Sequence, residues 1–174
     1  MNLNEAKSIL KRNGYTVLKE EFDYDAYLIN SYERSIGGDG PDSYEMHEYA
    51  REHCNLPTQE ELNKQLPDLQ TKIPGLIRIE YEQDFKDPEF DDDRVLLTDA
   101  VTLFVQYDSV ADAENDDLRA DNEEKYFNIL LKEIEGIDEV YESGISDQYD
   151  EGNVCYFTYI VKQKVPGYYT YDPD

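Results

Sequence analysis

The two histidines of this chain lie close together, beside a cysteine, in the segment YEMHEYAREHC. A helical zinc site uses two histidines four residues apart, because that spacing brings both rings to one face of the helix. His47 and His53 are six residues apart, about 240° around a helix, and Arg51 occupies the position four residues after His47. The spacing therefore favours structural or surface histidines over a zinc site completed by Cys54.

Two runs of carboxylates are the other candidates for chemistry. One run lies in the segment DFKDPEFDDDR, and the other lies between Asp108 and Asp121. Clustered carboxylates suit calcium, but neither run has the EF-hand order with its central glycine. Solvated loops, a calcium site and a protein-binding surface remain open as interpretations. We expect no cofactor and assign no metal ligands.

The residues predicted to bind a partner are acidic residues of these runs and tyrosines of the C-terminal segment VPGYYTYDPD. Tyrosine is favoured at the centres of protein interfaces, although this segment could instead pack on its own sheet. The predicted partner-binding residues are Asp87, Glu89, Asp91, Asp92, Asp93, Asp108, Asp112, Glu114, Asp116, Asp117, Tyr168, Tyr169 and Tyr171.

The charge of the chain is large and uneven. The formal net charge is −25 over 174 residues. From Glu80 to Asp174 there are 27 acidic and 7 basic residues, against 14 and 9 from Met1 to Ile79. One turn of B-DNA carries about 20 phosphates over about 34 Å, a length similar to the width of a domain of this size. The sign of the charge disfavours phosphate backbones and anionic membranes, and it favours basic proteins or cations as partners.

The sequence lacks recognisable catalytic motifs. It has no phosphate-cradling glycine loop, no nucleophile elbow and no supported Cys–His pair, so we expect a protein that is not an enzyme. No stretch approaches the roughly 18 apolar residues of a membrane span, and the opening MNLNEAKSIL does not read as a secretory signal. We therefore expect a cytoplasmic protein with Cys54 and Cys155 as free thiols, and with Cys155 buried in a strand.

The pattern of apolar residues in the first part of the chain, residues 1–74, predicts helices. An amphipathic helix is expected over residues 3–12, a second over 24–36 and a third over 43–53. A fourth should begin at Thr58, whose spacing from Glu61 is that of a capping box. We expect this helix to end by Leu66, because Pro67 cannot continue it.

Beyond Pro74 the period changes to the alternation of strands. Strands are predicted over 77–81, 95–107, 140–145 and 153–164, and the last is apolar on both faces, which places it centrally. A helix capped by Asp121, with Glu124 at its third position, is expected to follow an acidic loop. The fold class predicted is α+β, with the helical N-terminal region followed by an acidic ββαββ antiparallel-sheet domain with one packed helix over residues 75–165. Residues 166–174 form the tail.

The opening residues carry a resemblance. Between Leu3 and Tyr15 the pattern LNEAK-x-ILK-x-NGY resembles a short N-terminal segment of many small phage-encoded proteins of otherwise differing sequence. The resemblance implies a bacteriophage or mobile-element origin. Small acidic phage proteins include DNA mimics that occupy the DNA-binding clefts of restriction or CRISPR nucleases, and the charge surplus here is similar to theirs in kind.

A second similarity concerns layout alone. The order of strands and helix over residues 75–164 is similar to that of tail-terminator and neck proteins of long-tailed phages, which form rings, although the helices before Pro74 depart from that pattern. Our first expectation is a phage protein in the host cytoplasm whose acidic surface binds a basic host protein or nucleic-acid-binding enzyme, as a DNA-mimic inhibitor. The alternative is a virion component that contacts its own copies or other virion proteins, and a phage enzyme is the third class.

Overall fold

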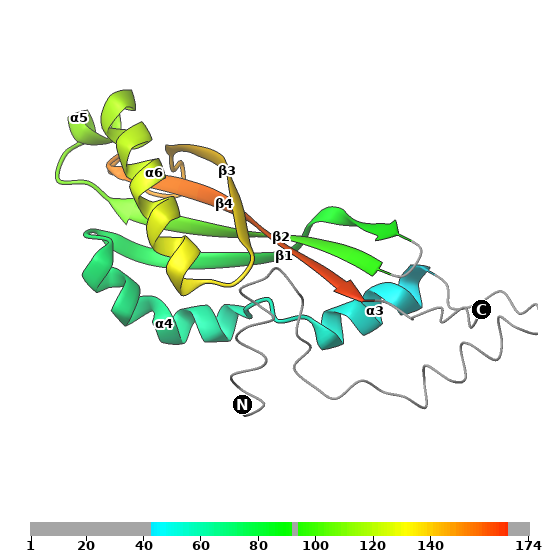
Figure 1. The fold of residues 1–174 in the computed structure, drawn as a ribbon. Coiled ribbons are helices and arrows are strands. Elements are labelled where there is room, and N and C mark those ends of the chain that lie inside the picture. Colours follow the sequence, from blue (N-terminus) through cyan, green and yellow to red (C-terminus); the bar gives the residue numbers. More distant parts are fainter. Residues whose placement is uncertain (1–42, 92–93, 167–174) are drawn as a thin grey trace, which may run out of the picture. The chain divides into compact units, whose positions relative to one another are not determined.

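The computed structural model describes residues 43–91 and 94–166 (Figure 1). The helices expected over residues 3–12 and 24–36, and the C-terminal tyrosines, lie outside the described residues. The elements are α3 (Ser43–His53), α4 (Gln59–Lys72), β1 (Leu76–Asp91), β2 (Arg94–Gln106), α5 (Val110–Ala113), α6 (Asp116–Glu133), β3 (Ile137–Ile145) and β4 (Val154–Pro166). The fold is mixed α+β with a four-strand antiparallel sheet, as the alternation predicts.

The strands are ordered β1-β2-β4-β3 in the sheet. Strand β4 is therefore central, which confirms the prediction made from its two apolar faces. Five consecutive residues of β4, from Phe157 to Val161, are buried. Strand β3 runs antiparallel to β4, with Ile137 opposite Val161 and Ile145 opposite Cys155.

The chain divides into two compact units. Of the described residues, the first unit contains 43–55, 86–91, 94–97 and 163–166, and the second contains Leu56–Phe85 and Thr98–Lys162. In the first unit the backbone N–H of Asn55 donates a hydrogen bond to Oε1 of Gln163 at 2.7 Å. The second unit contains α4, α5, α6, β3 and most of the other strands, and it carries the site described below.

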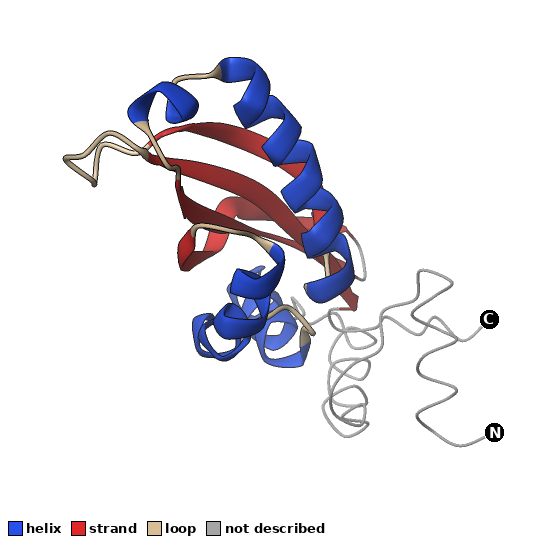
Figure 2. Ribbon diagram, turned by 90° about the vertical axis from the view of Figure 1, so that its left-hand side faces the viewer, coloured by secondary structure: helices blue, strands red, loops and turns tan. Residues whose placement is uncertain are grey.

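Helix α6 lies across one face of the sheet in the second unit (Figures 1 and 2). Tyr126 of α6 packs edge-on against Phe157 of β4, with ring centroids 5.1 Å apart. The hydroxyl of Tyr159 donates a hydrogen bond to the carbonyl oxygen of Glu123 at 3.0 Å. Burial raises the pKa of both Tyr126 and Tyr159 above the ordinary value, so both hydroxyls are neutral at physiological pH.

Helix α4 runs along β1 and begins with the predicted capping box. The hydroxyl of Thr58 accepts from the backbone N–H of Glu61 at 3.2 Å, and the Glu61 carboxylate accepts from the Thr58 N–H at 2.9 Å. The Gln59 side chain donates to the carbonyl of Ile79 at 3.0 Å and accepts from the N–H of Tyr81 at 2.8 Å. These two bonds satisfy backbone groups of an edge strand that would otherwise remain open to pairing.

The same helix continues through Pro67, so the prediction that it ends before this residue is wrong. A proline inside a helix costs about 3 kcal/mol. Leu62, Leu69 and the C-cap residue Ile73 are at most 1% exposed, and full burial of such side chains contributes about 1.5–3 kcal/mol each. Burial of the apolar face therefore outweighs the proline.

The acidic segment expected as a loop over residues 84–94 is mostly strand, because β1 extends to Asp91. The backbone of Asp84 has a φ of 53°, which a non-glycine residue seldom adopts. Its N–H donates a hydrogen bond to the side chain of Asp99 at 2.9 Å. The extended strand therefore includes a local irregularity that sequence alternation does not predict.

The second acidic segment also differs from the expected loop. It forms α5 and the first turns of α6, so two helices lie between the strand pairs instead of one. The N-cap of α6 is Asn115, whose side chain accepts from the N–H of Leu118 at 3.1 Å, and the predicted cap Asp121 lies inside the helix. Asp116 and Asp117 in the first turn suit the positive end of the helix dipole.

Candidate functional site

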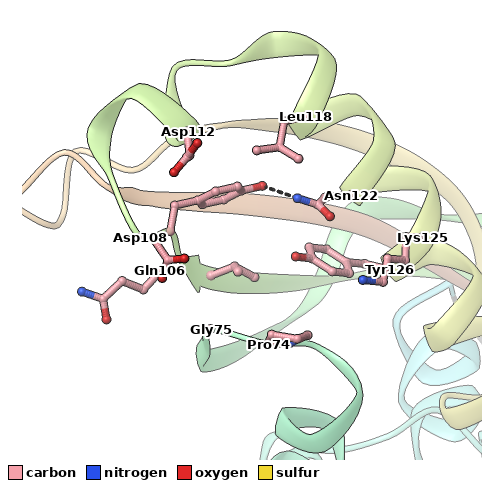
Figure 3. Close-up of a pocket in the computed structure, with 11 residues that line it drawn as sticks. Pro74, Gly75, Gln106, Asp108, Asp112, Leu118, Asn122, Lys125 and Tyr126 are labelled. Atoms are coloured by element: carbon pink, nitrogen blue, oxygen red, sulfur yellow. Dashed lines mark hydrogen bonds between the residues drawn. The ribbon is translucent and has the colours of Figure 1, made fainter.

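A pocket of about 410 Å³ lies where β2 leads into α5 and α6 (Figure 3). Tyr107 and Val105 at the end of β2 form part of its lining, and α6 adds Leu118 and Tyr126. Pro74, which precedes β1, lies on the opposite side. The apolar face of α6 and the end of a buried strand thus supply the walls of the pocket.

Gly75 allows the chain before β1 to approach the end of β2 at this pocket. Its φ is +81°, and a Cβ atom placed on it would lie 2.3 Å from the carbonyl oxygen of Gln106. The N–H of Gln106 donates to the carbonyl of Gly75 at 2.8 Å. Both the backbone conformation and the close approach require glycine here.

Two tyrosine hydroxyls face the pocket, and they differ in their partners. The Tyr107 hydroxyl accepts a hydrogen bond from the side-chain amide of Asn122 at 2.9 Å (Figure 3). Burial raises the pKa of Tyr107, and this hydrogen bond acts in the opposite direction. Tyr126 is only 3% exposed, and its hydroxyl points into the pocket without a hydrogen bond to any residue that the structure describes.

Charged side chains complete the lining. Asp108 is exposed and forms no ion pair within the described ranges. Asp112 is half-buried, and one of its oxygens accepts from the hydroxyl of Ser109 at 2.7 Å. Lys125 on α6 is exposed and likewise has no acidic partner among residues 43–91 and 94–166. The pocket therefore contains two carboxylates and one ammonium group.

The structure places the predicted partner-binding residues at several locations. Asp108 and Asp112 line the pocket. Glu114 caps α5, Asp117 is exposed in the first turn of α6, and Asp116 there pairs with Arg119. Asp87 and Glu89 are exposed on β1 in the first unit, and Asp91 ends that strand. Asp92, Asp93, Tyr168, Tyr169 and Tyr171 lie outside the described residues.

The uncharged members of the pocket are absent from the set predicted from sequence. Tyr107 ends the strand that alternation predicts over 95–107, and the sequence does not reveal that its ring borders a pocket. Asn122 and Tyr126 are four residues apart on α6, a spacing that places both on the same face. That spacing is the one sequence signal that could have indicated that Asn122 and Tyr126 belong to the same site.

A row of carboxylates follows the exposed side of α6. Asp117, Asp121 and Glu124 are all exposed, at intervals of four and three residues. A helix rises 1.5 Å per residue, so the intervals correspond to about 6 and about 4.5 Å along its axis. Within the part of the chain that the structure describes, none of the three forms an ion pair. We call Asp117, Asp121 and Glu124 the α6 acidic row.

The histidine and cysteine region forms local contacts. His53 is buried, its Nδ1 donates to the carbonyl of Tyr49 at 2.8 Å, and the two rings stack 4.0 Å apart. The Cys54 thiol donates to the Arg51 carbonyl at 3.2 Å. Both cysteines are free, and Cys155 is buried as predicted. Over the described ranges, no group of three or more His, Cys, Asp or Glu residues has a geometry that could hold a metal ion.

Comparison with known proteins leaves the function to be argued from these residues. No family model, curated protein or solved structure matches this chain. In the described part of the chain, none of the helices has the length and apolar character needed to cross a membrane. The α6 acidic row and the adjacent pocket are therefore the features from which a function can be inferred.

Proposed function

We propose that this is a non-enzymatic phage protein whose acidic surface binds a basic host protein, acting as a DNA mimic that inhibits a nucleic-acid-binding defence enzyme. The α6 acidic row is the observation that carries the proposal. Its spacing, about 4.5–6 Å along a rigid helix, is wider than the rise of about 3.4 Å between phosphates along one DNA strand but of the same order. A regular row of fixed negative charges is what a DNA-binding groove recognises on a duplex backbone.

The absence of ion pairs strengthens this interpretation. Asp117, Asp121 and Glu124 have no ion-pair partner among the described residues, although Lys125 follows Glu124 on the same helix, so the three carboxylates remain open to a basic partner. The net charge of −25 adds a long-range attraction for basic surfaces, which accelerates association with such a partner. The proposed phage origin rests separately on the N-terminal pattern between Leu3 and Tyr15.

A virion ring component is the second candidate, and exposed apolar side chains favour it. Leu131 of α6 and Tyr141 and Ile145 of the edge strand β3 are each more than 40% exposed, and such residues could meet a neighbouring copy. This candidate treats residues 75–165 as a ββαββ domain in which α6 is the packed helix and α5 a short addition. Light scattering separates the two functions, because an inhibitor should be a monomer or dimer and a ring should contain six or more copies.

The test begins with a partner captured from a bacterial lysate by the full chain. If the protein is a DNA mimic, a short DNA duplex should displace the captured partner, because both occupy the same groove. A variant carrying Asp117→Lys, Asp121→Lys and Glu124→Lys should then bind at least tenfold more weakly.

The matched control carries three reversals on the exposed turn between β3 and β4, at Asp147, Asp150 and Glu151. Both variants change the charge by the same amount, so diffuse attraction should weaken equally in the two. A partner that duplex DNA does not displace, or that tolerates reversal of the α6 acidic row, would contradict the mimicry proposal.

A further inference from the structure

We infer that the pocket beside Tyr126 receives an arginine side chain of a basic partner protein. The inference rests on the proposed function and deepens it, because it identifies an anchoring position on the acidic surface. The pocket adjoins the N-terminal half of α6, from which the α6 acidic row projects. A partner that binds the row therefore has its side chains within reach of the pocket.

The Tyr126 hydroxyl is the first argument. It lies on a side chain that is 97% buried, points into the pocket, and has no hydrogen-bond partner within the described residues. The hydroxyl oxygen is not among the fully buried side-chain atoms that lack a partner, which in the described residues are Nε of Arg78 and Oδ1 of Asn153, so it is accessible to a ligand in the pocket. A guanidinium group can satisfy it, because a guanidinium N–H donates and the hydroxyl oxygen accepts.

The aromatic rings and carboxylates are the second argument. Arginine stacks on aromatic faces and binds carboxylates through two parallel hydrogen bonds. The rings of Tyr107 and Tyr126 line the pocket together with Asp108, which has no hydrogen-bond or ion-pair partner among the described residues, and Asp112, of which one oxygen accepts from Ser109. The combination of apolar walls, tyrosine rings and a carboxylate suits the stem and the head group of one arginine.

The size of the pocket admits an arginine side chain, and its charge disfavours anionic ligands. A volume of about 410 Å³ lies within the range of about 300–1,000 Å³ for ligand pockets. The carboxylates of Asp108 and Asp112 repel phosphate groups. Lys125 is the opposing group, because its ammonium repels a bound guanidinium, and removal of that charge should therefore tighten binding.

The probe is the peptide acetyl-Gly-Arg-Gly-amide, added to the isotope-labelled full chain and followed by NMR. We expect saturable shifts of the Asn122 side-chain amide and of the Tyr126 ring, with a dissociation constant in the millimolar range. The citrulline peptide has nearly the same shape without the charge, and it should bind at least tenfold more weakly.

Single variants with conserved side-chain shape locate the contact. Tyr126→Phe should weaken binding of the arginine peptide about three- to tenfold, and Asp108→Asn about tenfold. Asp147→Asn is the matched control, because Asp147 is also exposed and unpaired within the described residues but lies neither in the α6 acidic row nor in the pocket lining. It should change binding less than twofold, whereas Lys125→Gln should strengthen binding about two- to threefold.

Three results would overturn the inference: equal binding of the citrulline peptide, equal effects of Asp108→Asn and Asp147→Asn, or loss of binding in Lys125→Gln. Failure of the inference is distinguishable from failure of the proposed function. If pocket variants bind the captured host partner normally while reversal of the α6 acidic row abolishes binding, the pocket inference fails and the mimicry proposal stands. If the arginine peptide binds as expected but duplex DNA does not compete with the host partner, the mimicry proposal fails alone.

Discussion

The carboxylate of Asp99 accepts a hydrogen bond from the backbone N–H of Asp84, with 2.9 Å between Oδ1 and N. Asp99 is fully buried, and its other oxygen accepts from the hydroxyl of Tyr81. Asp84 is the described non-glycine residue with a positive φ. One buried acid therefore fixes an uncommon backbone conformation inside β1, and it joins this strand to the neighbouring strand β2 through side-chain contacts.

Asp99→Ala should lower the free energy of unfolding by about 3 kcal/mol. The substitution removes the shared acceptor of two hydrogen bonds, and bonds to a charged group contribute about 1.5–3 kcal/mol each without being strictly additive. Urea denaturation measures the loss. Glu82→Ala is the control, because Glu82 is exposed on the same strand, and it should change stability by less than about 0.5 kcal/mol. Equal stability of the two variants would show that the buried acid does not hold the strand.

Pro67→Ala should stabilise the protein by about 1–2 kcal/mol. Proline in a helix interior costs about 3 kcal/mol relative to alanine, and part of this gain is offset because alanine gives the unfolded chain more freedom. Since Pro67 is exposed, the substitution leaves no cavity. A higher urea midpoint with an unchanged slope is the expected result. A lower midpoint would mean that α4 requires the proline, for example to maintain its curvature along β1.

Stability should fall as the pH rises above about 10. Burial raises the folded-state pKa of Tyr159 and of Tyr126 above the ordinary value of 10.0. The unfolded chain therefore releases these protons first, so the stabilisation is complete below pH 10 and is lost progressively above it. Each tyrosine contributes a slope of about 1.4 kcal/mol per pH unit. Denaturant titrations at several alkaline pH values measure this slope.

The variant Tyr159→Phe isolates one of these tyrosines. It should show a shallower alkaline slope, together with a stability at neutral pH lowered by about 1 kcal/mol, because the carbonyl of Glu123 loses its donor. A slope equal to that of the original protein would show that Tyr159 ionises normally in the folded state.

The sequence predicts elements where local chemistry and tertiary packing agree. The capping box of Thr58 is a local motif, and the central position of β4 follows from apolar residues on both faces. Prediction from sequence fails where contacts with residues far away along the chain determine the local structure. The end of α4 depends on burial of Leu69 and Ile73 beyond Pro67, and the extension of β1 past Asp84 depends on the side chain of Asp99, which is 15 residues away along the chain.

The candidate site is predictable only in part, for the same reason. An acidic surface between Asp108 and Asp117 follows from composition. Which of several Asn and Asp residues caps α6 depends on packing, since Asn115 and Asp121 are both good N-cap residues. No sequence pattern indicates that the Tyr126 hydroxyl lacks a partner among residues 43–91 and 94–166. The pocket therefore becomes visible only when β2 and α6 are placed together.

Added salt should raise the melting temperature at neutral pH. Like charges repel within the α6 acidic row and between Asp108 and Asp117, and ions screen this repulsion over about 8 Å at physiological ionic strength. Divalent cations should act more strongly than monovalent ions at equal concentration. A variant with Asp117→Asn, Asp121→Asn and Glu124→Gln should respond less to salt, because it contains less repulsion to screen.

A rise of many degrees in the melting temperature in a few micromolar calcium, without a similar rise in magnesium, would instead indicate a specific calcium site. Magnesium should match calcium if screening alone acts, since both ions carry the same charge.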